Sequence, residues 1–165
     1  MSSAPTTPTP RGCTNLKLRQ LTRRVSRDYD AVIGAASGLK TTQYSLLGHL
    51  ALLGPLRPAD LAARMLLEPS TLTRNLQPLI AQGWVRVDPG PDRRSRLVVL
   101  TDAGREQHAG ARSAWKQAQQ ALTTRLGAAR VGQLHALLDE CLAALAEDGG
   151  GSAAVPPAAP AQRDA

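Results

Sequence analysis

Apolar residues recur along most of the chain at three- and four-residue spacing, which predicts a mainly helical protein. A first helix is expected from about residue 14 to 35. The stretch 41–53, with Thr41 or Thr42 as its N-cap candidate, is apolar on nearly every side, as in a buried central helix. Short helices are predicted at 58–65 and from residue 69, each opening with a proline. A long helix follows from 102 to 126, and a last one carries an apolar stripe formed by Val131, Leu134, Leu138, Leu142 and Leu145.

Between residues 84 and 100 the pattern changes to alternation. The segments WVRV and RLVVL flank the turn-rich DPGPDRRS, which predicts a β-hairpin. Two short helices around a tight turn, followed at once by a two-stranded wing, form a winged helix-turn-helix. The predicted fold class is therefore mainly α with a small β-hairpin wing, and the winged helix-turn-helix spans 41–101.

The helix that begins at residue 69 has two different faces. The face expected to pack inward carries Leu72, Leu76, Leu79 and Ile80. A short-polar and basic surface suited to the DNA major groove is formed by Ser70, Thr71, Thr73, Arg74 and Gln77. This arrangement predicts sequence-specific binding of double-stranded DNA.

The predicted wing is rich in arginine. Arg86, Arg93, Arg94 and Arg96 lie within one short hairpin, and an arginine at a hairpin tip suits the negative potential of a narrow minor groove. Asp92 precedes Arg94 by two residues, so we expect its carboxylate to pair with that guanidinium and fix its direction.

Charge and composition agree with an anionic partner. The 165 residues carry a formal net charge of +7, and no stretch approaches the length of a membrane span. The start of the chain lacks a secretory signal pattern, so a cytoplasmic protein is expected. Residues 1–12 and 148–165 have the Pro, Gly, Ser, Thr and Ala bias of disordered tails. The histidines lack metal-ligand spacing and no catalytic or cofactor-binding motif is present, so neither an enzyme, a metal site nor a cofactor is predicted.

The stretch Ala59–Ala63, followed by STLTRNLQPL, GWV and DRRSRLVVLTDAG, resembles the MarR family of winged helix-turn-helix regulators. The resemblance implies that residues 13–40 and 102–147 form a helical dimerisation domain around a DNA-binding lobe at 41–101. A two-fold homodimer would then bind a near-palindromic operator, with Ser70 to Gln77 in the major groove and Asp92 with Arg94 at the minor groove. It further implies a transcriptional regulator, usually a repressor, that a small aromatic or phenolic effector releases from DNA.

One segment departs from the family pattern. Where many members have glycine at the turn between the two short helices, this chain reads Met65-Leu66-Leu67-Glu68. Leu66 must therefore bear the cost of a left-handed backbone or mark a different turn. Glu68 is a weaker N-cap than aspartate, and Pro78 is expected to kink its helix near Arg74.

An effector pocket is the least constrained prediction. Its candidate residues are Tyr29, Tyr44, His49 and Trp115, each of which has a packing or surface role as its alternative. No residue pattern selects between the two interpretations.

The two cysteines suggest an alternative signal. Cys13 lies at the start of the first helix, where the helix dipole favours a thiolate, and Cys141 lies near the end of the last helix. In a MarR-like dimer these chain ends converge, so an intersubunit disulfide is conceivable. A redox-sensing regulator of the same fold is therefore the alternative function, and two inert thiols remain the other interpretation.

Overall fold

The computed structural model describes residues 11–92 and 94–147. The predicted tails lie outside these residues, except for Arg11 and Gly12, and so does Arg93 of the wing. The element order matches the predicted one, with bounds α1 Thr14–Ser37, α2 Thr41–Leu53, α3 Pro58–Arg64, α4 Pro69–Ala81, β1 Val85–Pro89, β2 Arg96–Leu100, α5 Asp102–Leu126 and α6 Ala128–Glu147.

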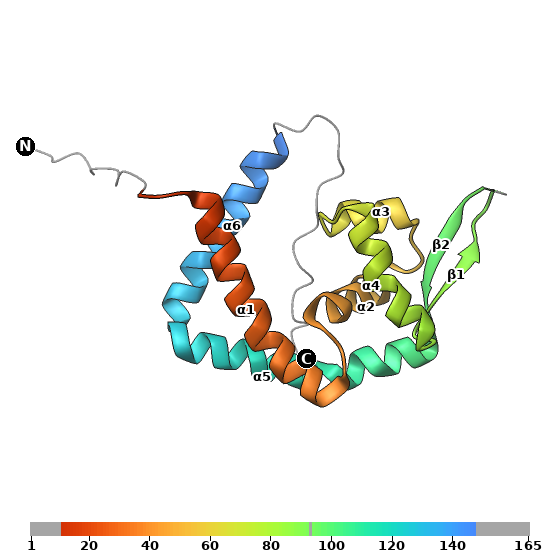
Figure 1. Ribbon diagram of the computed structural model, residues 1–165, viewed down its shortest axis with the longest axis horizontal. Coiled ribbons are helices and arrows are strands. Elements are labelled where there is room, and N and C mark those ends of the chain that lie inside the picture. Colours follow the sequence, from red (N-terminus) through yellow and green to blue (C-terminus); the bar gives the residue numbers. More distant parts are fainter. Residues whose placement is uncertain (1–10, 93, 148–165) are drawn as a thin grey trace, which may run out of the picture.

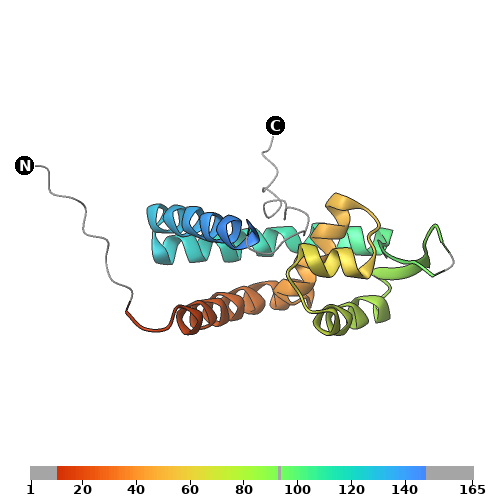
Figure 2. The ribbon, with the colours of Figure 1, turned by 90° about the horizontal axis from the view of Figure 1, so that it is seen from above.

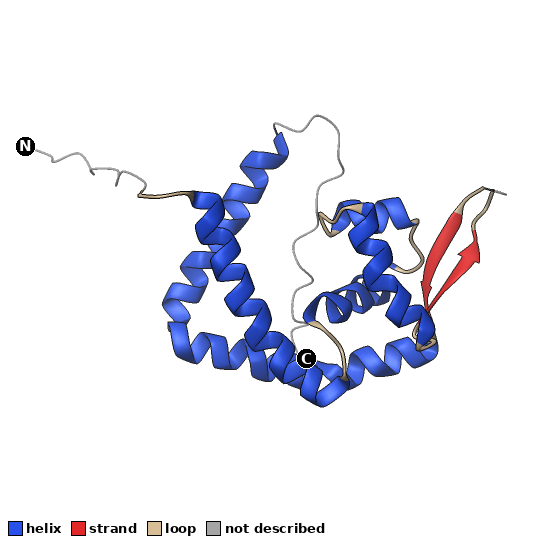
Figure 3. Cartoon of the chain, viewed as in Figure 1, coloured by secondary structure: helices blue, strands red, loops and turns tan. Residues whose placement is uncertain are grey.

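The elements form two regions joined by α5. Helices α2, α3 and α4 gather with the hairpin at one end, which we call the winged lobe (41–101), and α5 runs beneath it to the other end (Figures 1 and 3). There α6 folds back on α5, while the first half of α1 extends separately (Figure 2). We call residues 14–27 of α1 and all of α6 the arms. None of the described helices is long and apolar enough to cross a bilayer.

The core lies under the winged lobe and continues along α5. It is built from aliphatic residues because the chain has no phenylalanine. Three leucines of α2 are fully buried, which confirms α2 as the central helix, and they meet buried leucines of α3 and α4. Small residues of α5 then let α1 approach closely. Tyr29 and Ile33 of α1 pack on the side of α5 that carries Ala111, Ala114 and Ala118.

The hairpin is fastened at its base and along one edge. Strands β1 and β2 pair antiparallel from Val85 opposite Leu100 to Pro89 opposite Arg96. Leu56 exchanges two backbone hydrogen bonds with Val98, at 3.2 and 2.8 Å, and so forms an isolated β-bridge to β2 just before α3.

The start of α5 explains the sequence LTDAG. Thr101 is the N-cap, its hydroxyl oxygen accepts the Gly104 amide proton at 3.0 Å, and its own proton reaches the carbonyl oxygen of Gly83 at 2.7 Å. A Cβ at Gly104 would lie 2.1 Å from the carbonyl oxygen of Trp84. Glycine is therefore required for the first turn of α5 to pack against the base of the wing.

The turn between α3 and α4 bears out the expected cost at Leu66. Its φ is +50°, a left-handed conformation that no other described non-glycine residue adopts. The amide of Leu66 donates to the carbonyl oxygen of Ala63 at 3.1 Å, and the amide of Leu67 donates to the carbonyl oxygen of Ala62 at 2.9 Å. This is the hydrogen-bond pattern of a Schellman motif. Leu66 thus occupies the position at which helices normally place glycine.

Three local predictions need correction or refinement. Thr41 is not the N-cap of α2, because Lys40 holds that position and the amide and hydroxyl of Thr41 both donate to Oδ1 of Asp30 at 2.7 Å. Ile80 is 41% exposed rather than buried, since the inward stripe of α4 is completed by Leu72, Leu76 and Leu79. Pro78 lies inside α4, and the helix continues beyond it to Ala81.

Candidate nucleic-acid interface

The polar face of α4 is turned to solvent. Ser70, Thr73, Arg74 and Gln77 are exposed and Thr71 is half-buried, while the three inward leucines hold the opposite face in the core. The Thr73 hydroxyl donates to the carbonyl oxygen of Pro69 at 2.9 Å, which fixes the direction of its side chain. The five side chains therefore form one surface along a single helix.

The beginning of α4 has no side-chain cap. Glu68 occupies the N-cap position with extended backbone, but its carboxylate makes no capping hydrogen bond, as its length predicts. Pro69 follows at the first helical position. The positive end of the helix dipole therefore keeps its capacity for an anion such as a phosphate group.

At the wing turn, the predicted pairing of Asp92 with the Arg94 guanidinium is wrong. Oδ1 of Asp92 instead accepts backbone amide protons from Ser95 at 2.6 Å and Arg94 at 3.2 Å, and Oδ2 faces Nη2 of Arg57 at 3.6 Å. An aspartate beside a turn reaches the amides two and three residues on more easily than a mobile guanidinium. Asp92 still orients the wing, through its backbone.

Hydrogen bonding also keeps Asp92 charged. Ser95, through its side chain and its backbone amide, lowers the pKa of the Asp92 carboxyl, and the Arg94 amide and the Arg57 guanidinium add to the effect. The carboxylate of Asp92 therefore stays ionised to a lower pH than that of an ordinary aspartate.

The wing arginines fall into two groups. Nε of Arg86 donates to both carboxylate oxygens of Asp88 at 2.9 Å, so the positive charge on β1 is neutralised locally. Arg94 and Arg96 are exposed, and neither forms an ion pair with a carboxylate among the described residues. The available positive charge of the wing therefore lies on the side of β2 and of the start of α3.

Arg57 belongs to this surface and was missed from the sequence. It lines an open depression between the start of α3 and the wing turn, together with Pro58, Asp92, Arg94, Ser95 and Arg96. Its place there depends on the pairing of Leu56 with Val98, a long-range contact without a local sequence signal.

Comparisons with known proteins show which family has this arrangement. The MarR family model matches residues 37–95, from the end of α1 to the wing turn. The M. tuberculosis transcriptional regulator MosR, solved in complex with DNA, is 33% identical, with a TM-score of 0.68 over 81% of this chain and 98% of MosR. The chain belongs to the MarR family.

Two further proteins extend the comparison. A mutant of E. coli MarR in complex with operator DNA is 26% identical, with a TM-score of 0.66 over 78% of this chain and 95% of that one. The HTH-type transcriptional regulator YwoH of Bacillus subtilis is 34% identical over 71 residues, which are 43% of this chain and 52% of YwoH. The match thus spans about half the length of this curated relative. The family and these proteins are transcriptional regulators, not enzymes.

In this MarR-family chain, the four candidates for an effector pocket make different contacts. Tyr44 of α2 stacks with Trp115 of α5 at a ring separation of 6.2 Å. The Tyr29 hydroxyl donates to Gln119 of α5, and Nδ1 of His49 is hydrogen-bonded to the Ser45 carbonyl oxygen on its own helix. The effector pocket therefore stays a prediction, with Tyr44 and Trp115 as the pair that shares a contact.

His108 completes that aromatic cluster. Its ring lies 4.6 Å from the ring of Tyr44, and it precedes Trp115 by two helical turns, a spacing that could have revealed their common face. Burial lowers the pKa of His108, and the charge of Arg112 lowers it further. Burial raises the pKa of Tyr44 and of Tyr29. The cluster is thus neutral near pH 7, at the contact between α2 and α5.

Both cysteines of this MarR-family chain are free and exposed. Cys13 is the N-cap of α1 and makes no side-chain capping bond, and Cys141 lies in α6. Cys141 therefore lies on one arm and Cys13 directly precedes the other, and both are remote in sequence from the winged lobe.

Proposed function

We propose that the protein is a homodimeric cytoplasmic repressor that binds double-stranded DNA at a near-palindromic operator. The observation that carries this proposal is the exposed polar face of α4 next to a wing whose turn directs Arg94 and Arg96 to solvent. The α4 surface from Ser70 to Gln77 would read base edges in the major groove, and the wing arginines, Arg93 included, would enter the minor groove. MosR and E. coli MarR, both solved with DNA, support the same use of the fold.

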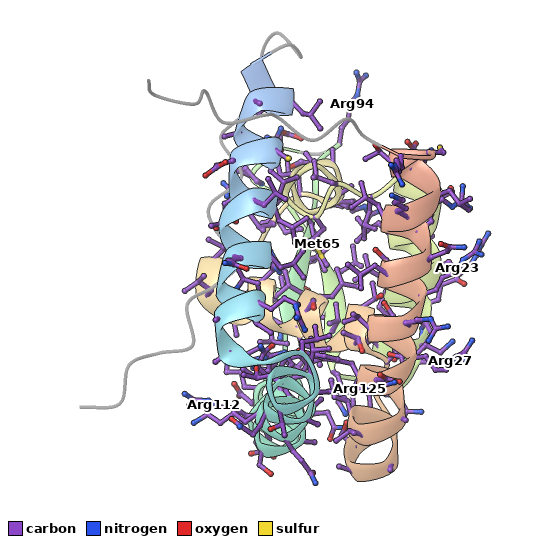
Figure 4. All side chains as sticks on the ribbon, turned by 90° about the vertical axis from the view of Figure 1, so that its left-hand side faces the viewer. Arg23, Arg27, Met65, Arg94, Arg112 and Arg125 are labelled. Atoms are coloured by element: carbon purple, nitrogen blue, oxygen red, sulfur yellow. The ribbon has the colours of Figure 1, made fainter. Side chains whose placement is uncertain are left out.

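The arms support a homodimer. Their leucines are exposed, at 55% for Leu16, 53% for Leu142 and 72% for Leu145, and Val131 is the one described residue of α6 that is buried. A helix of this length gains little stability from its own hydrogen bonds in water, so it needs an apolar surface to cover it. Arg23 and Arg27 point away from α6 (Figure 4), which keeps these charges off the side that faces it. A second copy supplies matching leucines by two-fold symmetry.

The domain division follows from this argument. Residues 13–40 and 102–147 would dimerise, and they would set the distance between two winged lobes. Successive major grooves on one face of DNA are about 34 Å apart, so a change in the angle between lobes weakens binding.

We further propose that a small aromatic or phenolic effector causes this change. The support is the stack of Tyr44, His108 and Trp115, which joins the winged lobe to α5. A flat ligand that inserts beside this stack would shift the lobe relative to the dimer helices. Titration of candidate phenolic acids should then quench Trp fluorescence and release DNA at the same concentrations, and a Trp115→Phe variant would separate the signal of Trp115 from that of Trp84.

Oxidation is the alternative signal. The exposure of Cys13, directly before one arm, and of Cys141 on the other favours it, because thiols on neighbouring chain ends of a dimer can be joined. Mass spectrometry of the dimer after peroxide treatment decides between the two signals. If DNA is released while Cys13 remains reduced, the redox alternative is wrong.

The DNA-binding proposal is tested by selecting bound fragments from the chromosome of the source organism. Affinity for the selected duplex should fall steeply with salt concentration, and Arg74→Ala and Arg94→Ala should each weaken it. Arg125→Ala is the matched control, because this exposed arginine pairs with Asp28 near the far end of α5. If Arg94→Ala left the affinity unchanged, the assignment of the wing would be wrong.

A further inference from the structure

The depression between the start of α3 and the wing turn has an uneven charge balance. Among the described residues that line it, three are arginines, namely Arg57, Arg94 and Arg96, and one, Asp92, is a carboxylate. The arginine of the neighbouring strand β1, Arg86, is already neutralised by Asp88. The depression is therefore a place on the winged lobe where positive charge is concentrated and open to solvent.

The backbone of Arg57 is held firmly beside the wing. The preceding residue, Leu56, is bonded to Val98 of β2 through both its amide and its carbonyl group. The following residue, Pro58, restricts Arg57 to extended backbone, and its φ and ψ are −65° and 145°. The position of Arg57 relative to Arg96 on β2 is thus fixed by the fold and not by the ion pair of its side chain.

The side chain of Arg57, in contrast, is held loosely. Its guanidinium lies 3.6 Å from Oδ2 of Asp92, and the two side chains are 54% and 60% exposed. Exposed pairs of this kind contribute little to stability. Asp92 does not need Arg57 to keep the turn, because its other oxygen accepts the amides of Ser95 and Arg94.

We propose that Arg57 binds a phosphate group of the DNA backbone in this depression, next to the wing arginines that enter the minor groove. When DNA docks, Arg57 exchanges the Asp92 carboxylate for the phosphate, while Oδ1 of Asp92 continues to hold the wing turn. The inference rests on the proposed DNA-binding function and adds to it a contact outside α4 and the wing. Because the ligand is a phosphate, the contact strengthens binding to any sequence and carries no base specificity.

Arg57→Gln removes the charge and keeps a long polar side chain, so it tests the contact directly. Dissociation constants are measured over a series of KCl concentrations for the wild-type full chain and the variant, on a selected operator duplex and on a random-sequence duplex. The affinity of the variant for both duplexes should fall by the same factor. The magnitude of the slope of log K against log salt concentration should fall by about 1 for each bound subunit. Arg57→Lys should keep the wild-type slope, and Arg125→Gln, the matched control, should change neither quantity.

The variant Asp92→Asn distinguishes two roles of Arg57, namely binding a phosphate group and holding Asp92 in place. Asparagine can still accept the two turn amides, but it no longer competes for Arg57. We therefore expect tighter binding to both duplexes, by about two- to fivefold, as for the loss of one exposed ion pair. If Arg57 acted only by holding Asp92, this variant would weaken binding as much as Arg57→Gln does.

The outcomes separate this inference from the proposed function. An unchanged salt slope in Arg57→Gln, or a loss confined to the operator duplex, would overturn the phosphate site while leaving operator binding in place. If the wild-type chain bound neither duplex, the proposed function itself would be wrong. Circular dichroism of each variant confirms that the comparison is between folded proteins.

Discussion

The winged lobe and the arms use the same residue, leucine, in opposite ways. Leu46, Leu47 and Leu50 of α2 and the inward leucines of α4 are buried in one core, whereas most leucines of α6 and of the first half of α1 are exposed. The lobe is therefore stabilised within one chain. The arms show an apolar stripe that a single chain does not cover, which is the basis for proposing a second copy.

A charge placed in the arms should have the largest effect, and it should prevent assembly while the winged lobe stays folded. Leu142→Glu places a charge in the exposed apolar stripe, and two-fold symmetry makes the substitution count twice. Removing two buried leucines costs about 3 to 6 kcal/mol before the charge is considered, so the dimer dissociation constant should rise at least 100-fold. Sedimentation equilibrium measures this change. Glu140→Gln replaces a charged side chain by an uncharged one of similar shape at an exposed position on the same helix, and it should leave the dissociation constant close to that of the wild type.

Breaking the lobe should instead lower the stability of each chain. Leu46 is fully buried in α2, and Leu46→Ala should reduce the free energy of unfolding by about 2 to 5 kcal/mol. The loss should be the same in a Leu142→Glu background, because the two residues belong to independent regions. Urea unfolding of both backgrounds checks this expectation, and a loss that depends on dimerisation would contradict the separation of the regions.

A substitution in the turn between α3 and α4 should raise the free energy of unfolding, by less than Leu46→Ala lowers it. Leu66 holds a left-handed conformation while 68% of its surface is exposed, so glycine would relieve backbone strain and lose few contacts. Leu66→Gly should stabilise the protein by about 1 kcal/mol. Leu66→Ala keeps the strain and should not stabilise it, and thermal unfolding distinguishes the two variants.

The free energy of unfolding should also depend on pH, through the stack that joins the winged lobe to α5. The folded-state pKa of His108 is below its unfolded value of 6.5, so folding favours the neutral ring. This contribution to stability is complete above pH 6.5 and is lost as the pH falls through the folded pKa. His108→Gln should therefore flatten the fall in stability from pH 7 to pH 5 that urea unfolding measures.

The sequence predicted the helices well because their signals are local. Prolines 58 and 69 start α3 and α4, glycines follow α1 and α2, and apolar spacing shows which face is buried. The strained turn at Leu66 was also predictable, since a Schellman motif without glycine leaves no other residue to adopt positive φ.

Two of the errors concern residues whose partners lie elsewhere in the fold, and a third concerns a local turn. Arg57 joins the wing because Leu56 pairs with Val98, and the hydrogen bonds of Thr41 reach back to Asp30 on α1. Asp92 was given the wrong partner because two charges near in sequence were weighed above the backbone amides of the turn. The contacts of Arg57 and Thr41 follow from the tertiary arrangement and not from spacing along the chain, whereas those of Asp92 lie within three residues and follow from the chemistry of the turn.

The central claim is that two winged lobes, set apart by dimerised arms, read two half-sites. Hydroxyl-radical footprinting on a selected chromosomal fragment tests it most directly. We predict two protected segments about 10 base pairs apart, related by two-fold symmetry, with flanking minor-groove protection that disappears in Arg94→Ala. A single protected half-site, bound equally well by Leu142→Glu, would contradict the account.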